Sequence, residues 1–242
     1  MENMNHAASG VSKALVQRLR ALQQAGVQQL PRTTSTAPKI TPENRSSSPI
    51  ATTPVVAGGL EGLAAEVAAC TLCHELATTR TQTVFGVGNP RAELCFLGEA
   101  PGADEDRQGE PFVGRAGMLL TDIIQKGMKL RRQDVYILNI LKCRPPGNRN
   151  PAGDEVAHCR PFFERQLEII QPKFICCLGS VAAQNLLETN VSVGRLRGKL
   201  HDWQGHQVLV TYHPAYLLRN PAAKKDTWED IQLLMEAMGL KS

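Results

Sequence analysis

Several features that would place the chain in a specialised class of protein are missing from its sequence. No uninterrupted apolar run reaches the roughly 18 residues that a membrane-spanning helix needs. The amino terminus, MENMNHAASG, lacks the apolar segment of a secretory signal, and no internal repeat is visible. We therefore expect a cytoplasmic protein that does not associate with membranes.

Neither sign of charge dominates the composition. The 27 Lys and Arg residues exceed the 23 Asp and Glu residues by four, and the sequence pI is about 8.7. This mild excess is compatible with a polyanionic partner but is too common to establish one. The chain does contain seven cysteines. Without a secretory signal, these indicate metal, redox or core roles rather than a disulfide framework.

The first 60 residues differ in composition from the rest of the chain. Val11, Leu15, Leu19 and Leu22 recur at helical spacing, which predicts an amphipathic helix within residues 1–30. Residues 31–60 are rich in Pro, Ser and Thr and poor in large apolar side chains, so we expect a disordered linker. At 242 residues the chain has room for one sizeable domain, which we place at residues 61–242.

Short apolar segments alternate with helical patterns in this domain. Four of these segments predict buried strands: Leu94–Leu97, Val135–Leu141, Phe174–Leu178 and Val208–Thr211. One helix is predicted near residues 114–128, and another after Asp226. A third is predicted to have Asn150 as its cap and Pro151 as its first residue, with a kink at Pro161. This alternation predicts a mostly parallel sheet with helices on both faces. Ligands of such sheets bind beyond the carboxyl ends of the strands, where four loops of this chain would converge.

Four cysteines are spaced as a metal site could require. Cys70 and Cys73 form a C-x-x-C pair, Cys143 ends a predicted strand, and Cys159 lies on the core face of a predicted helix. Four thiolates would suit either tetrahedral zinc or a [4Fe–4S] cluster, and the spacing does not decide between them. Cys143 and Cys159 could instead be ordinary core residues, because free cysteine is usually buried. The remaining three cysteines lie inside apolar strands, where packing is the expected role.

Taken in order, these motifs carry a family resemblance. The cysteine pair is followed by GEAPGADEDRQGEPFVGRAG, NILKCRPPGNRNP and HPAYLLRNP. With these segments the chain resembles a family 4 uracil-DNA glycosylase, the iron–sulfur branch of that superfamily, from Cys70 to about Met238. The resemblance implies a three-layer α/β/α sandwich around a central four-stranded parallel sheet. It also implies a [4Fe–4S] cluster held by Cys70, Cys73, Cys143 and Cys159.

The activity implied by the resemblance is hydrolysis of the bond that joins uracil to deoxyribose in DNA. Such an enzyme extrudes the nucleotide from the duplex and leaves an abasic site, the first product of base excision repair. Phe112 would stack on the uracil ring, and the Asn139 amide would pair with its N3–H and O4. Ala100 and Gly102 of the first loop would also contact the substrate. In isolation Phe112 could be a core residue and Asn139 a cap or turn residue.

Three further residues are assigned to catalysis. His213 would donate a hydrogen bond to uracil O2 as negative charge develops on the leaving group. Glu99 or Glu105 would stabilise the sugar cation or orient the attacking water. Better-known uracil-DNA glycosylases carry an aspartate at the position of Ala100, so no general base is assigned there.

Binding to DNA requires phosphate contacts and a side chain that fills the gap left by the extruded base. The residues assigned to these contacts are Leu217, Leu218, Arg219, Arg144, Arg149 and Arg115. The expected partner is uracil-containing DNA, single- or double-stranded. The protein should be a monomer, and its amino-terminal helix could dock a protein partner.

Two other classes of function compete with a monofunctional glycosylase. A relative could hold uracil-containing DNA without turnover, but the covalent trapping relatives carry an extra basic loop with a histidine that the short CRPPGNRNP segment lacks. An iron–sulfur sensor with a decayed site is the other alternative. The joint presence of Phe112, Asn139 and His213 argues against it.

Overall fold

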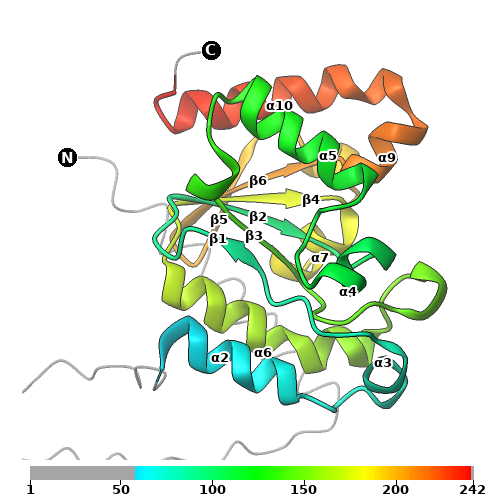
Figure 1. Ribbon diagram of the computed structural model, residues 1–242. Helices are drawn as coiled ribbons and strands as arrows, with labels where there is room; N and C mark the ends of the chain where they lie inside the picture. The colour runs from blue at the N-terminus through cyan, green and yellow to red at the C-terminus, as the bar shows by residue number, and fades with distance from the viewer. Residues whose placement is uncertain (1–57, 241–242) are drawn as a thin grey trace, which may run out of the picture. The chain divides into compact units, whose positions relative to one another are not determined.

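The computed structural model describes residues 58–240, which form the α/β unit drawn in colour in Figure 1. The predicted helix within residues 1–30 and the predicted linker, apart from its last three residues, lie outside the described residues. The first described helix, α2, begins at Gly59. This first described helix thus begins two residues before the predicted boundary at residue 61.

A six-stranded sheet forms the centre of the structure. Its strands are β1 (Val87–Gly88), β2 (Leu94–Gly98), β3 (Tyr136–Asn139), β4 (Phe174–Leu178), β5 (Leu200–Trp203) and β6 (His206–Thr211). Their order is β1-β3-β2-β4-β6-β5. The four central strands are mutually parallel, which confirms the predicted four-stranded parallel sheet. The edge strands β1 and β5 pair antiparallel and were not predicted.

The central strands are buried on both faces. Every residue of β2, β3 and β4 is buried, which explains why these strands appear in the sequence as continuous apolar runs. Cys95, Cys176 and Cys177 are fully buried within them, and burial raises the pKa of each thiol. The packing role predicted for these three cysteines is confirmed.

Helices connect the strands and cover both faces of the sheet. The α-helices are α2 (Gly59–Ala69), α3 (His74–Thr79), α4 (Ala103–Gln108), α5 (Arg115–Asp122), α6 (Gly153–Ile170), α7 (Ser180–Leu186), α8 (Val193–Leu196), α9 (Pro214–Arg219) and α10 (Lys224–Ala237). Shorter turns are the π-helical η1 (Ile123–Gly127) and the 3₁₀ turns η2 (Arg132–Asp134), η3 (Pro146–Asn148) and η4 (Pro221–Ala223).

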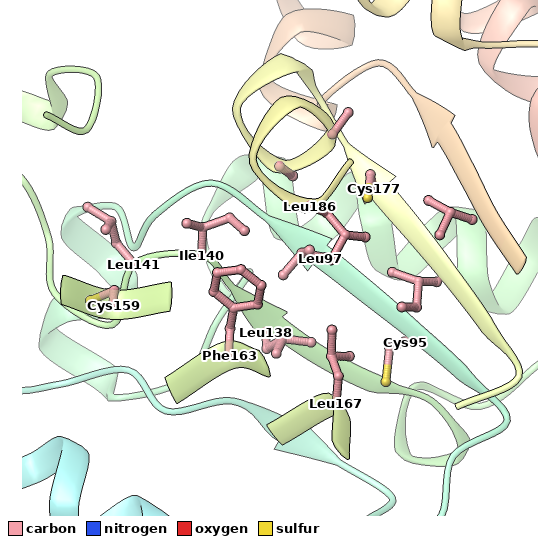
Figure 2. Close-up of a cluster of buried hydrophobic side chains, with 14 of the residues drawn as sticks. Cys95, Leu97, Leu138, Ile140, Leu141, Cys159, Phe163, Leu167, Cys177 and Leu186 are labelled. Atoms are coloured by element: carbon pink, nitrogen blue, oxygen red, sulfur yellow. The ribbon is translucent and has the colours of Figure 1, made fainter. Parts of the chain in front are cut away.

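Two apolar cores separate the three layers. Alternate strand residues such as Phe96 and Ile137 pack with α5 and α10 on one face. Their neighbours, including Leu97 and Leu138, pack with α6, α7 and α8 on the other face. Figure 2 shows Phe163 of α6 directed at this second set of strand side chains. The predicted three-layer α/β/α sandwich is thus confirmed (Figure 1).

The longest helix differs from its prediction at the amino terminus. Helix α6 begins at Gly153 with Ala152 as its cap, rather than at Pro151 with a cap at Asn150. The Glu155 carboxylate accepts the Ala152 backbone N–H at 2.7 Å and thereby satisfies one donor at the start of the helix. The helix continues through Pro161 to Ile170.

Among the helices of residues 58–240, none combines the length and the apolar composition that crossing a bilayer requires.

Candidate active site

A single cavity lies beyond the carboxyl ends of the parallel strands. It has a volume of about 860 Å³ and is lined by residues that directly follow β2, β4 and β6 and by the last residue of β3. These include Glu99 after β2, Asn139 at the end of β3, Gly179 after β4 and His213 after β6. The strands therefore bring four distant parts of the sequence to one place, as the position of ligands in parallel sheets predicts.

Phe112, Asn139 and His213 meet in this cavity. The rings of Phe112 and His213 have centroids 5.6 Å apart and are tilted by 34°. Gly98 lies next to both Asn139 and Phe112: a Cβ atom at position 98 would be 2.3 Å from Asn139 Oδ1 and 2.6 Å from the Phe112 ring. The ring of Phe112 and the amide of Asn139 can thus approach each other because position 98 carries no side chain.

The Asn139 side chain has an unmet hydrogen bond. Asn139 is 2% exposed, and within residues 58–240 its Oδ1 atom has no hydrogen-bond partner. A buried polar atom without a partner costs roughly 1–3 kcal/mol. Gln166 Oε1 and Thr227 Oγ1 also lack partners among the described residues, but of the three only Asn139 lines the cavity. The oxygen is available to a ligand that donates a hydrogen bond.

The protonation state of His213 follows from its surroundings. Its Nδ1 atom accepts the backbone N–H of Ala215 at 3.1 Å, as the cap of α9. Burial, reinforced by the positive charge of Arg219 and opposed by Glu105, lowers the pKa of His213 to about 4. At neutral pH the imidazole is therefore uncharged and carries its proton on Nε2, from which it can donate.

Phe112 is held in an unusual backbone conformation. Its φ angle is 54°, in the left-handed region that non-glycine residues seldom adopt. The Arg132 guanidinium donates to the carbonyl oxygens of Pro111 at 2.7 Å and Phe112 at 3.1 Å. Gly117 allows close approach, because a Cβ atom there would be 1.9 Å from the Phe112 oxygen. Phe112 is 6% exposed, so it is part of the core and of the cavity wall at once.

The two candidate carboxylates have different environments. Glu105 Oε1 accepts the backbone N–H groups of Val113 at 2.9 Å and Gly114 at 3.0 Å, and Oε2 accepts that of Gly102 at 3.1 Å. Glu105 therefore joins the start of α4 to the loop that carries Phe112. The Glu99 side chain has no hydrogen-bond partner among the described residues, and burial raises its pKa. Glu99 is the carboxylate that remains available to a substrate.

Ala100 and Gly102 line the cavity beside these carboxylates, where contact with a substrate was predicted. A side chain at Gly102 would collide with Glu105, since a Cβ atom would be 2.7 Å from its Oε2. Helix α4 is anchored further by Asp106, which is buried and accepts the Thr81 backbone N–H at 2.9 Å and the Thr81 hydroxyl at 2.7 Å.

The predicted DNA-contacting arginines fall into two groups. Arg115 and Arg219 are exposed, line the cavity and make no ion pair within residues 58–240. Arg149 also lines the cavity, but it forms ion pairs with Glu75 and Glu155, both at 2.6 Å. Arg144 is half-buried outside the cavity lining and donates to Asn148 at 2.8 Å. Arg149 is therefore already neutralised by protein carboxylates.

The two predicted wedge leucines point in different directions. Leu217 is 1% exposed, whereas Leu218 is 38% exposed. A buried side chain cannot enter the gap in a DNA stack without unpacking α9. Leu217 is therefore the packed leucine of the pair, and Leu218 is the one whose side chain is open to a ligand.

The four spaced cysteines interact with one another electrostatically. Burial raises the pKa of Cys73 to about 12, and negative charge on Cys159, Glu155, Cys143 and Cys70 adds to this. Arg80 donates to Cys143 Sγ at 3.0 Å, and the Cys73 sulfur is 3.4 Å from His158 Nδ1. Within residues 58–240, no three His, Cys, Asp or Glu side chains are grouped tightly enough for a single metal ion.

The four free cysteines are a ligand set that suits either a zinc ion or a [4Fe–4S] cluster. Zinc draws four sulfurs to about 2.3 Å from one centre. A [4Fe–4S] cluster is larger than one ion, so its thiolate ligands stand farther apart. Arg80 would balance part of the negative charge of such a group.

Three residues near the cavity were missed in the sequence. Arg132 had no motif to mark it, and its role depends on contacts with a loop 20 residues away. Tyr212 and Tyr216 line the cavity on either side of His213 in the chain. Tyr216 is within the HPAYLLRNP motif, so an exposed aromatic beside the histidine was the available signal.

Fold and cavity together define an α/β protein with a ring, an amide and an imidazole gathered in a cavity at the carboxyl edge of a parallel sheet. Comparison with known proteins shows the family to which it belongs. The family model for the uracil DNA glycosylase superfamily matches residues 85–232. The type-4 uracil-DNA glycosylase of Archaeoglobus fulgidus is 44% identical over 190 residues, covering 75% of this chain and 94% of that protein.

Further relatives give the same picture. The type-4 uracil-DNA glycosylase of Thermotoga maritima is 44% identical over 177 residues, covering 72% of this chain and 91% of that protein. A type-5 uracil-DNA glycosylase of Thermus thermophilus is 27% identical over 220 residues, covering 74% and 97%. The chain belongs to the uracil DNA glycosylase superfamily, in its type-4 branch.

Proposed function

We propose that this protein is a monofunctional glycosylase that removes uracil from DNA and thereby begins base excision repair. The observation that carries the proposal is the buried Asn139 oxygen, which lacks a partner beside Phe112 and His213. Uracil N3–H is a donor that would satisfy this oxygen. Cytosine has an unprotonated N3 and would leave it unpaired, so the same atom would discriminate between the two bases.

The chemistry needs opposite charges to be stabilised on the two sides of one bond. The bond between uracil N1 and deoxyribose C1′ breaks, uracil keeps the electron pair, and water adds to C1′ with release of a proton. His213 would donate its Nε2 proton in a hydrogen bond to uracil O2 as negative charge grows there. Glu99 would face the positive sugar or orient the water. Glu105 would act as a positioning residue that holds the Phe112 loop.

Extrusion of the nucleotide requires contacts outside the base site. Leu218 is the exposed leucine of α9 and would fill the gap in the stack. Arg115 and Arg219 would contact phosphates. Arg144 and Arg149 would orient the 144–150 segment rather than supply free charge, since their side chains are engaged with Asn148 and with two glutamates.

Cys70, Cys73, Cys143 and Cys159 would hold a [4Fe–4S] cluster. When bound, the cluster would crosslink the segment between α2 and α3 to the end of β3 and to α6. We assign it no step in the hydrolysis. The amino-terminal helix at residues 1–30, the linker at residues 31–60, the cytoplasmic location and the monomeric state remain part of this proposal.

The test is release of uracil by the purified full-length chain. A single-turnover assay uses oligonucleotides that contain one uracil, cytosine or thymine, with alkaline cleavage to reveal abasic sites. We expect strand cleavage only with uracil, and Asn139→Ala should lower the rate by about 100-fold or more. Binding of uracil-containing DNA without abasic sites would instead indicate a protein that holds its ligand without turnover.

A further inference from the structure

A second aromatic group lies in the same cavity as the proposed uracil site. The rings of Tyr212 and Tyr216 are stacked, with centroids 5.1 Å apart and planes inclined by 25°. The Arg197 guanidinium lies over the Tyr212 ring, 5.7 Å from its centroid. Tyr216 is 39% exposed, so part of its ring is open to solvent. We call these three residues the tyrosine stack.

A buried carboxylate, that of Asp230, holds the Arg197 side chain of the tyrosine stack in place. Arg197 Nε donates to Asp230 Oδ2 at 3.0 Å, and Asp230 is fully buried. Asp230 also accepts the Thr211 hydroxyl at 2.7 Å and the Gly198 backbone N–H at 2.9 Å. Since this carboxylate has three donors and no exposure, the guanidinium it binds has little freedom. The aromatic surface is therefore organised before any ligand arrives.

The location of the stack connects it to the base site. Tyr212 directly precedes His213, and Tyr216 is on the helix that His213 caps. The cavity that contains Phe112 and Asn139 is also lined by His213, both tyrosines and Gln184. Its volume of about 860 Å³ is in the range that holds a drug-sized molecule, which exceeds the requirement of one pyrimidine.

The chemistry of the stack favours a base over a phosphate as its ligand. Arg197 is the cation at the stack, and its charge is already matched by Asp230. The open surface is then an uncharged aromatic ring. Nucleobases stack on such rings whatever their sequence, whereas phosphates require free donors or cations.

We propose that Tyr216 stacks on the base next to the extruded uracil in the same strand. This subsite deepens the proposed function and rests on it, because extrusion of uracil deprives the neighbouring base of one stacking partner. Leu218 fills the gap within a duplex stack, whereas Tyr216 becomes the stacking partner of a neighbouring base that has left the stack. Tyr212, Arg197 and Asp230 keep the Tyr216 ring in position. The subsite favours strands whose neighbouring base is free to leave the helix, above all single-stranded DNA.

The test measures binding, so that it does not depend on cleavage. Two single-stranded oligonucleotides carry one 2′-fluoro-2′-deoxyuridine, which resists hydrolysis. In one the uracil has adenine on both sides, and in the other it has abasic tetrahydrofuran residues. Fluorescence anisotropy then gives the dissociation constants of the wild-type chain, Tyr216→Ala and Tyr216→Phe.

For the wild-type chain we expect about ten-fold weaker binding when the neighbouring adenines are removed, the loss of one stacking contact. Tyr216→Ala should bind the adenine oligonucleotide about ten-fold more weakly than the wild-type chain does, and it should bind the abasic oligonucleotide as well as the wild-type chain does. Tyr216→Phe should bind like the wild-type chain. The comparison between the two oligonucleotides needs no variant, so a folding defect in Tyr216→Ala would not remove the test.

Several outcomes would overturn the subsite. These are equal losses of Tyr216→Ala on both oligonucleotides, a Tyr216→Phe variant as weak as the alanine, or equal wild-type affinities for the two strands. Uracil release from the cleavable oligonucleotide is scored separately, so neighbour-dependent binding without release would defeat the glycosylase assignment alone.

Discussion

Glu105 Oε1 accepts the backbone N–H of Val113 at 2.9 Å, across a loop of eight residues. The next residue in the loop, Gly114, donates to the same oxygen at 3.0 Å. Phe112 therefore precedes two backbone amides that are fixed by one carboxylate. The sequence made both glutamates candidates for catalysis and favoured Glu105, whereas this relationship gives Glu105 a positioning role and leaves Glu99 available.

The first prediction compares Glu99→Gln with Glu105→Gln. Glu99→Gln should lower the single-turnover rate by about 100-fold or more with little change in stability, because it removes charge at the cavity. Glu105→Gln should lower the free energy of unfolding by about 1–3 kcal/mol, because its amide group would face one of the backbone N–H donors. Thermal unfolding and rates on uracil-containing DNA check both effects. Wild-type stability of Glu105→Gln would contradict the positioning role.

The second prediction concerns pH. The pKa of His213 is lowered from 6.5 to about 4 by burial, so the unfolded chain binds a proton at this residue between pH 6.5 and 4 and the folded chain does not. The stability that this residue contributes is complete well above pH 6.5 and falls by about 3 kcal/mol as the pH drops to 4. Denaturant unfolding of the wild-type chain and of His213→Gln should give a shallower pH dependence for the variant in that window. Parallel curves would show that His213 keeps its ordinary pKa.

A third prediction concerns the four spaced cysteines. Cys73→Ser and Cys159→Ser should lower the iron and sulfide content below four of each per chain and weaken a broad visible absorbance. Cys95→Ser is the matched control, because this cysteine is buried in β2 and should affect stability but not iron content. Elemental analysis that finds one zinc per chain and no iron would contradict the cluster.

The fourth prediction uses salt to separate the arginines. Arg219→Ala should weaken DNA binding and reduce the slope of log affinity against log salt by about 1, because an exposed arginine can release a phosphate counterion. Arg149→Ala should change this slope little, since the guanidinium is paired with Glu75 and Glu155. Binding to a hydrolysis-resistant uracil oligonucleotide at several salt concentrations measures both slopes. A larger change for Arg149→Ala would reverse the assignment.

The strands that could be predicted are those buried on both faces. Sequence indicated β2, β3, β4 and β6 because burial on both faces requires continuous apolar runs. It did not indicate β1, which has two residues, or β5, whose residues Leu200–Trp203 are half-buried or exposed and include His and Asp. Edge strands of this kind carry no periodic signal that distinguishes them from loops.

In the site, too, residues within sequence motifs could be predicted, whereas contacts between residues far apart in the sequence could not. Motifs in order placed Phe112, Asn139 and His213 correctly around one cavity. The pairing of Arg149 with Glu75 joins residues 74 positions apart and had no local signal. Leu217 and Leu218 are adjacent in a helix, so about 100° of rotation decides which one is buried, and the sequence left that rotation undetermined.

Arg80 and Thr81 are neighbours in the chain, yet one binds the sulfur of Cys143 and the other binds Asp106 of α4. A single peptide bond thus connects a residue bound to Cys143 with a residue that anchors α4, the helix whose Glu105 holds the loop that carries Phe112. Oxidation of the cysteines that displaced Arg80 and Thr81 would at the same time break the hydrogen bond from Thr81 to Asp106 of α4. Loss of the visible absorbance of the proposed cluster and loss of the proposed uracil release should therefore follow one time course rather than two.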